Sequence, residues 1–401
     1  MASNGADGGK KFDISNLSKC ANEIIDAIKD SIKNLARLNV IVAGKTGSGK
    51  STLINSVFRA NLAETGIGMP VTQNMRKYTK EGVPLTIYDT VGFELSKEIR
   101  DASQQEIAET IKKCELSGDD NQRIHCLWYC INAAGGRVEQ GEIDWLREIS
   151  NVCKFSHVPV IIVLTQSYDK EKTKAINGVL QEEKLECLGI IPVLAQDFIF
   201  KFRGETHEQQ SFGLEDLIEV MEKALPNELQ DTLQNLQKVS LESKKNSAHK
   251  IVAFTVTAAG GIGAAPIPLS DAFLLVTAQL EMLRKITVIF GIDVDANTMK
   301  ILLSATLGVG GATLFGRAAV TAILKCIPGA GSLVGGAIAA GTAMLITTAL
   351  GEAYIKLMEK VWLGEVKFNS NIGDIMSDLF KDELKRRKNK GNDDPDTLPV
   401  S

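Results

Sequence analysis

Residues 41–55, IVAGKTGSGKSTLIN, constrain the fold of this chain more strongly than any other stretch. Residues 44–51 fit the pattern G-x-x-x-x-G-K-S/T, between a short apolar run and an apolar run with helical spacing. A glycine-rich turn that leaves a strand and opens a helix lets successive backbone N–H groups surround phosphate oxygens, and the helix N-terminus adds its dipole. The stretch therefore predicts a phosphate-binding loop (P-loop), in which Lys50 reaches the β- and γ-phosphates and Ser51 binds Mg²⁺. The predicted nucleotide contacts of this loop are Gly44, Thr46, Gly47, Ser48, Gly49, Lys50, Ser51 and Thr52.

The segment 38–226 alternates apolar runs typical of strands with stretches typical of helices. The runs that predict strands are residues 38–44, 85–92, 123–132, 158–166 and 189–195. Several of them are continuously apolar, as expected for parallel strands that are covered on both faces. Residues 75–81, MRKYTKE, predict a more exposed edge strand. The alternation predicts a doubly wound α/β domain with a mainly parallel sheet.

The rest of the chain divides by composition into four further segments. Residues 1–37 predict a disordered start followed by an amphipathic helix. Residues 227–249 are polar and helix-prone, and predict a connecting helix. Residues 250–362 are rich in Ala, Gly, Leu and Ile with only scattered charges, and predict an all-α hydrophobic domain. Residues 363–401 predict a helical, charged tail, whose basic cluster KDELKRRKNK indicates either a solvated surface or contact with anionic lipid.

A second motif, DTVG at residues 89–92, follows one of the predicted strands. Asp89 there can hold Mg²⁺ through water, and the Gly92 amide can contact a γ-phosphate and make the next loop sense it. Between the two motifs, Thr72 offers a second hydroxyl ligand to Mg²⁺ while a triphosphate is bound. The ordered set predicts a metal site formed by Ser51, Thr72 and Asp89.

These motifs resemble those of the Era-like and septin-like translation-factor-class P-loop GTPases, over about residues 39–226. The resemblance rests on GKTGSGKS, on Thr72 in PVT and on DTVG. It implies that the chain binds GTP and GDP with Mg²⁺ and hydrolyses GTP, and that the GTPase domain can form a homodimer, as septin-like GTPases do.

The same resemblance places the guanine-reading loop at IIVLTQSYD and the last base-contacting loop at IPVLA. It implies base contacts from Thr165, Gln166, Asp169 and Ala195. The usual family motif is Asn/Thr-Lys-x-Asp, so here Gln166 replaces the lysine and Asp169 comes one residue late. Asp169 therefore has two interpretations: it reads the base across a one-residue bulge, or it caps the helix that begins with DKEKTK.

The catalytic set predicted from these motifs is Lys50, Thr72, Gly92 and Arg137. Phe93 stands where many related enzymes place a glutamine that orients water, and an apolar ring cannot hydrogen-bond water. We therefore expect slow intrinsic hydrolysis that needs help from a dimer partner, a mobile loop or an arginine. Arg137 lies after a Gly-Gly turn, where it either contacts phosphate or is an ordinary surface arginine.

Residues 326–351 contain 26 residues without a formal charge. A helix of that length spans about 39 Å, which exceeds a hydrocarbon core of about 30 Å, but its glycine, serine and threonine content makes insertion marginal. Residues 267–283 and 325–354 resemble a glycine-rich helical domain of uncharacterised function found beside Era-like GTPase domains in bacteria, whose members are often predicted to associate with membranes. The sequence is compatible with two interpretations of this half: a membrane-associated domain and a soluble helical bundle.

Composition narrows the functional classes. The net charge is −4, which gives no reason to expect nucleic acid as a partner. The seven cysteines show no zinc-binding spacing and suit a cytoplasmic protein, with membrane association through the C-terminal domain as a further expectation. Two functions compete: a slow GTPase whose nucleotide state controls the hydrophobic domain at a membrane or a partner, and a septin-like module that dimerises with negligible turnover.

Overall fold

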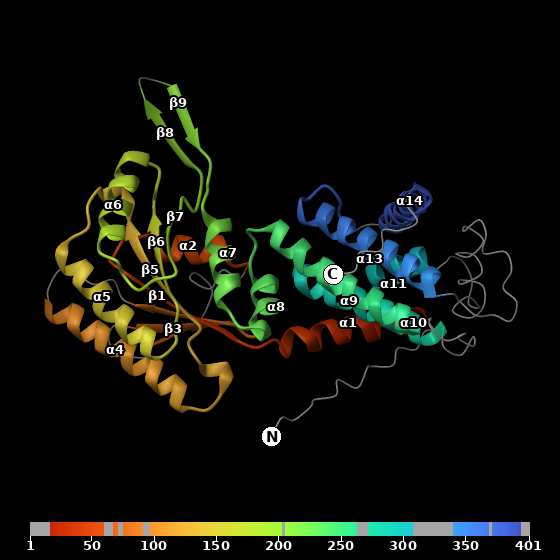
Figure 1. Cartoon of the computed structure of the whole chain (residues 1–401), viewed down its shortest axis with the longest axis horizontal. Helices are drawn as coiled ribbons and strands as arrows, with labels where there is room; N and C mark the ends of the chain where they lie inside the picture. Colours follow the sequence, from red (N-terminus) through yellow and green to blue (C-terminus); the bar gives the residue numbers. More distant parts are fainter. Residues whose placement is uncertain are drawn as a thin grey trace, which may run out of the picture. The chain divides into compact units, whose positions relative to one another are not determined.

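The computed structural model of this chain describes residues 17–59, 67–70, 75–90, 97–202, 205–262, 272–307, 340–368 and 371–393. The chain forms two compact units (Figure 1). The first, which we call the sheet unit, comprises residues 32–243. The second, the helical unit, comprises residues 1–31 and 244–401.

Seven strands of the described residues form one sheet in the order β2-β3-β4-β1-β5-β6-β7. Strands β4, β1, β5, β6 and β7 are parallel, whereas β2 and β3 pair antiparallel at one side. The strands are β1 (Leu38–Gly44), β2 (Ile67–Pro70), β3 (Met75–Thr79), β4 (Leu85–Thr90), β5 (Cys126–Asn132), β6 (Val160–Thr165) and β7 (Gly189–Pro192). The predicted fold class, a mainly parallel α/β sheet followed by a helical region, is confirmed.

Helices cover both faces of this sheet, which explains why its central strands are continuously apolar. Every residue of β1 and of β6 is buried. Helices α2, α7 and α8 share one apolar cluster with the sheet, and α4, α5 and α6 share the other (Figure 1). The helices are α2 (Lys50–Val57), α4 (Lys97–Leu116), α5 (Gln140–Phe155), α6 (Lys170–Glu182), α7 (Leu214–Ala224) and α8 (Asn227–Leu236). Short 3₁₀ helices, η1 (Asp120–Gln122) and η2 (Ala133–Gly135), flank β5.

Two features of the sheet unit differ from the sequence prediction. Strand β3 is not an edge strand, because β2 pairs with its outer side from Ile67 to Pro70. No strand was predicted for the segment that contains β2, because its glycines and proline give no alternation of apolar and polar residues. The antiparallel hairpin of β8 (Phe198–Phe202) and β9 (Glu205–Gln209) was not predicted either.

The predicted single connecting helix over residues 227–249 is wrong, because the chain forms two helices there, α8 and α9 (Leu241–Ile262). Gln237 adopts an extended conformation after α8, and its Oε1 accepts hydrogen bonds from the N–H groups of Val239 and Ser240. The Ser240 hydroxyl then accepts from Ser243 N at 3.2 Å, as an N-cap does. Side chains that bond their own backbone favour caps and turns over a continuous helix.

The described helices of the helical unit pack around apolar side chains and a few buried polar contacts. They are α1 (Leu17–Lys33), α9, α10 (Ala272–Phe290), α11 (Ala296–Leu307), α13 (Ala340–Trp362) and α14 (Ile372–Asp393). Lys244 is fully buried, and its ammonium donates to the Ile289 carbonyl at 2.9 Å and faces the Trp362 ring. Among the described residues, no helix combines the length and apolarity that crossing a membrane requires. Of the apolar run at 326–351, residues 326–339 lie outside the described residues.

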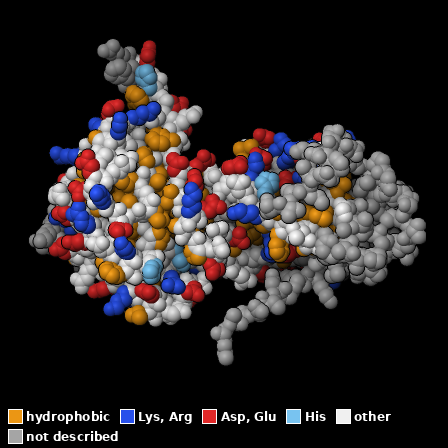
Figure 2. All heavy atoms as spheres, in the orientation of Figure 1, with side chains coloured by type: hydrophobic (Ala, Val, Ile, Leu, Met, Phe, Trp, Pro, Cys, Tyr) orange, Lys and Arg blue, Asp and Glu red, His pale blue; other side chains and the backbone are white. Residues whose placement is uncertain are grey.

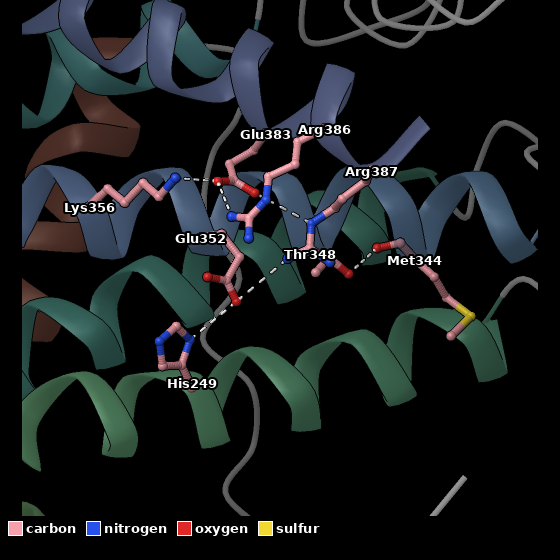
Figure 3. A network of polar contacts seen from close by, with 8 residues as sticks. All are labelled: His249, Met344, Thr348, Glu352, Lys356, Glu383, Arg386 and Arg387. Atoms are coloured by element: carbon pink, nitrogen blue, oxygen red, sulfur yellow. Dashed lines mark hydrogen bonds and ion pairs between the residues drawn. The ribbon is translucent and has the colours of Figure 1, made fainter. Parts of the chain in front are cut away.

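A network of charged side chains joins α9, α13 and α14 (Figure 3). Glu383 of α14 is 1% exposed and accepts a hydrogen bond from Lys356 of α13. Arg386 and Arg387 each lie 3.6 Å from its carboxylate. Arg387 also faces Glu352 at 3.8 Å, and Glu352 lies 3.2 Å from His249 Nδ1. The basic cluster of the tail is therefore partly engaged with acidic side chains of its own unit.

We expect this network to make the stability of the helical unit depend on pH. Burial alone raises the pKa of Glu383, but Lys356, Arg387 and Arg386 outweigh it and hold that pKa below its ordinary value. A carboxylate with a depressed pKa stabilises the fold above its unfolded pKa of about 4.3 and loses that contribution as pH falls. Glu383→Gln should cost about 2 kcal/mol at pH 7 and much less at pH 3.5. Denaturant unfolding at both pH values measures this, with Asp378→Asn, at an exposed ion pair of α14, as the control.

Candidate nucleotide-binding site

The P-loop lies between the carboxyl end of β1 and the start of α2. Gly44, Gly47 and Gly49 adopt positive φ angles of 142°, 74° and 82°, which residues with a side chain rarely adopt. The Lys50 ammonium folds back over the loop and donates to the carbonyls of Gly44 at 2.8 Å and Lys45 at 3.1 Å. The loop is therefore already curved, with its lysine inside it.

Asp89 lies beside this loop, because β4 pairs with β1 and brings Asp89 opposite Val42. Its Oδ1 atom is buried and has no hydrogen-bond partner among the described residues. Burial raises the pKa of Asp89 despite the nearby charges of Lys50 and Arg76, and burial lowers the pKa of Lys50 despite Asp89. An orphaned, buried carboxylate oxygen is an acceptor that a hydrated cation would satisfy, so the residues present fit Mg²⁺.

Ser51 lies exposed in the first turn of α2. Thr46, Gly47 and Thr52 are exposed as well, whereas Ser48 is buried and its hydroxyl has no partner among the described residues. The predicted contacts Thr72 and Gly92 lie outside the described residues, as does Phe93.

The predicted base-reading segment touches the P-loop directly. Thr165, at the end of β6, donates its hydroxyl to the carbonyls of Ser48 at 2.5 Å and Ile131 at 3.1 Å. Gln166, with φ 53°, donates its side-chain amide to the Gly47 carbonyl at 3.0 Å. Gln166 thus holds the P-loop from the end of β6. Ser167 N donates to the Val193 carbonyl at 3.2 Å, which brings the segment close to Ala195 after β7.

Asp169 caps helix α6 in this structure. Its Oδ1 atom accepts from the N–H groups of Glu171 and Lys172, both at 3.1 Å. Its Oδ2 atom lies 3.7 Å from the Lys172 ammonium. The helix-capping interpretation therefore describes its present contacts, and a role in reading the base stays a prediction.

Arg137 is exposed in the loop between η2 and α5. This loop, residues 136–139, was predicted from its glycines, but the contacts that hold its flanks were not. Lys172 donates to the Ala134 carbonyl at 3.2 Å, and its methylene groups face Gly136.

Tyr168, next to Asp169, stacks on Phe198 of the unpredicted hairpin at 4.2 Å between ring centroids. Contacts between segments so far apart in sequence leave no local pattern to recognise.

A cavity of about 1000 Å³ lies at the opposite edge of the sheet, where the parallel strands begin. Its lining mixes Lys33, Arg37 and Arg123 with Glu115, Asp120 and Glu228, so it shows no preference for one sign of charge. Figure 2 likewise shows acidic and basic side chains interspersed over the visible face of the sheet unit.

A curved P-loop with a seated lysine, beside a buried carboxylate on a mainly parallel sheet, defines a P-loop nucleoside triphosphate-binding domain. Residues 39–166 match the family described as 50S ribosome-binding GTPase, and residues 228–385 match a domain of unknown function, DUF697. The sheet unit is therefore a GTP-binding P-loop GTPase domain, followed by a second domain of unknown function. The predicted resemblance to septin-like GTPases with an appended helical domain is confirmed.

Curated relatives include two septins. Septin-12 of Homo sapiens is 24% identical over 201 residues, which cover 43% of this chain and 55% of that protein. Neuronal-specific septin-3 of Danio rerio is 26% identical over 185 residues, 40% of this chain and 50% of that protein. The chain thus spans about half the length of these relatives. Among solved structures, Toc33 from Arabidopsis thaliana is similar with a TM-score of 0.31 and 15% identity, over 51% of this chain and 91% of that one.

Proposed function

We propose that this protein is a slow, Mg²⁺-dependent GTPase whose nucleotide state controls its helical domain. The observation that carries the GTPase part is the seated Lys50 beside the orphaned carboxylate of Asp89. Lys50 would neutralise the β- and γ-phosphates, and Ser51, Asp89 and Thr72 would hold the metal. Bound Mg²⁺ supplies charge neutralisation of the phosphates. The family match supports guanine nucleotide as the ligand.

We infer slow hydrolysis from the sequence that follows the DTVG motif. Phe93 follows Gly92, where a glutamine would orient the attacking water. Arg137 lies on an exposed loop and is our candidate for the missing positive charge, in its own site or in that of a second copy. A single-turnover GTP assay with purified protein measures the rate directly. Arg137→Ala should lower it, and an unchanged rate would make Arg137 an ordinary surface residue.

The control of the helical domain rests on the segments that contain Thr72 and Gly92, which a triphosphate orders and hydrolysis releases in switch GTPases. Such a switch can change another part of the protein only if that part has two conformations whose free energies differ by no more than a few kcal/mol. The marginal hydrophobicity of residues 326–351 makes the helical domain our candidate for that output, at a lipid surface.

Liposome flotation tests this coupling. Full-length protein should partition into anionic vesicles to different extents with GDP and with a non-hydrolysable GTP analogue. Thr72→Ala should still bind nucleotide but lose the difference. Equal flotation in both states would reject the coupling and leave a GTPase with an appended helical domain of separate role.

The similarity to septins favours a second candidate, a module that dimerises through its GTPase domain with negligible turnover. The two functions differ in how activity depends on protein concentration. Turnover that rises with concentration indicates help from a second copy. GTP-dependent dimerisation without turnover, measured by light scattering, supports the septin-like module.

We expect Asp169 to determine whether the site prefers a guanine or a xanthine nucleotide. If its carboxylate accepts from the guanine ring, Asp169→Asn should lose GTP affinity about 100-fold and gain XTP affinity, because the amide presents a donor where the acid presents an acceptor. The measurement compares GTP, ATP and XTP affinities in wild type and mutant. Gln166→Ala is the companion variant, since it removes the side-chain contact with the Gly47 carbonyl and leaves Asp169 in place. Unchanged nucleotide preference in Asp169→Asn assigns Asp169 to helix capping alone.

A further inference from the structure

The side chain of Lys45 leaves the P-loop, although its backbone belongs to it. The Lys45 carbonyl accepts from the Lys50 ammonium at 3.1 Å and from Ser48 N at 3.1 Å. Its own ammonium lies 2.9 Å from Glu142 Oε2 and 3.3 Å from Glu139 Oε2. Two carboxylates at the start of α5 therefore hold the second lysine of the P-loop.

Glu142 is a buried, hydrogen-bonded partner of Lys45 and not a surface carboxylate. Its side chain is 5% exposed, and its Oε1 atom accepts from the Tyr129 hydroxyl at 3.0 Å. Tyr129 is buried in β5 and packs on Trp145 of α5 with 4.9 Å between ring centroids. A buried carboxylate is costly unless it is paired and hydrogen-bonded. Both conditions are met here, so strand, helix and P-loop meet at one carboxylate.

The contact lies next to the loop that carries Arg137. That loop ends at Glu139, the N-cap position of α5, and Lys45 contacts both Glu139 and Glu142. Its beginning is held by Lys172, which donates to the Ala134 carbonyl at 3.2 Å. The P-loop and the Arg137 loop are thus joined through the Lys45 side chain.

We propose that Lys45 is a positioning residue that fixes the P-loop to the start of α5 through Glu142, and so sets the shape of the phosphate site. This role rests on the proposed function, because it assumes that the P-loop binds GTP. The alternative is that Lys45 contacts phosphate directly and that its contact with Glu142 is incidental. The two roles differ in what happens when Glu142 is changed.

A double-mutant cycle separates these roles. The variants are Lys45→Met, Glu142→Gln and the double variant, which removes both charges and leaves no unpaired buried carboxylate. We expect each single variant to weaken GTP affinity about tenfold and the double variant to be no weaker than the weaker single variant. Lys45→Arg should restore affinity to within about threefold, because it keeps the charge that Glu142 needs. Glu139→Gln is the matched control at the more exposed carboxylate, with an expected change of less than about twofold.

Two results would overturn the proposal while leaving GTP binding intact. One is a Glu142→Gln variant with wild-type affinity beside a weakened Lys45→Met variant, which assigns Lys45 to the phosphate. The other is a double variant whose decrease in affinity equals the product of the two single decreases. Failure of the wild type to bind GTP would instead reject the proposed function, and the positioning role with it.

Discussion

Lys50→Ala should lower the affinity for GTP at least about 100-fold while the domain stays folded. The ammonium of Lys50 lies inside the P-loop, where two carbonyls hold it at 2.8 and 3.1 Å. It faces the place that the β- and γ-phosphates occupy in this motif, and each charge-assisted hydrogen bond to phosphate there is worth about 1.5–3 kcal/mol. Titration of a fluorescent GTP analogue measures the decrease in affinity.

The fold should survive this change for an electrostatic reason. Burial lowers the pKa of Lys50. In the nucleotide-free protein, keeping this buried ammonium charged therefore costs folding free energy. Removing the charge does not take away a stabilising ion pair with good geometry, and the melting temperature should stay close to that of the wild type. Lys154→Ala is the control, since that lysine is exposed and pairs with Glu186 at the surface. Wild-type affinity in Lys50→Ala would contradict the P-loop assignment.

Sequence patterns predicted those parts of the site that are each encoded by a single short segment. The P-loop, the strand before it and the carboxylate of Asp89 follow from local patterns, because apolar runs and glycine spacing encode strand, turn and helix within a few residues. The buried parallel strands were predicted for the same reason.

Contacts that join distant segments were beyond such patterns. Gln166 differs from the family motif in sequence, but nothing in that difference shows that its amide reaches the Gly47 carbonyl. Strand β2 pairs with β3 from Ile67 to Pro70, and its sequence carries no alternation that would reveal it. The break at Gln237 depends on side-chain hydrogen bonds to residues 239 and 240, which compete with a helix that propensity favours.

Gly44→Ala should destabilise the sheet unit far more than Gly47→Ala, although both glycines belong to the P-loop and both have positive φ angles. A Cβ atom at Gly44 would lie 2.3 Å from the Cys130 carbonyl oxygen and 2.9 Å from the Ser48 hydroxyl. A Cβ atom at Gly47 would meet no described atom within 4 Å. An alanine at either position would therefore strain the backbone, but only at Gly44 would its Cβ atom also clash with neighbouring atoms.

The steric clash at Gly44 cannot be avoided by a small movement. Gly44 pairs with Cys130 in the parallel ladder of β1 and β5, so the oxygen in the way belongs to the backbone of a buried central strand. A side chain could rotate away, but this carbonyl moves only if the two strands separate. Backbone strain costs about 1–2 kcal/mol at either glycine, and overpacking adds about 1–3 kcal/mol at Gly44. At about 2–4 °C per kcal/mol, the melting temperature of Gly44→Ala should fall by roughly 10 °C, and that of Gly47→Ala by about 3 °C.

Nucleotide binding should follow the same order in the two variants. Displacing Gly44 moves the carbonyl that accepts from Lys50, so Gly44→Ala disturbs the lysine together with the strand. Thermal melting with and without GTP measures both effects in one experiment, because a ligand that binds the folded state raises the melting temperature. Equal melting temperatures for the two variants would contradict the close approach of β1 and β5 at this point. A GTP-dependent rise in Gly44→Ala as large as in wild type would show that the loop keeps its shape without the glycine.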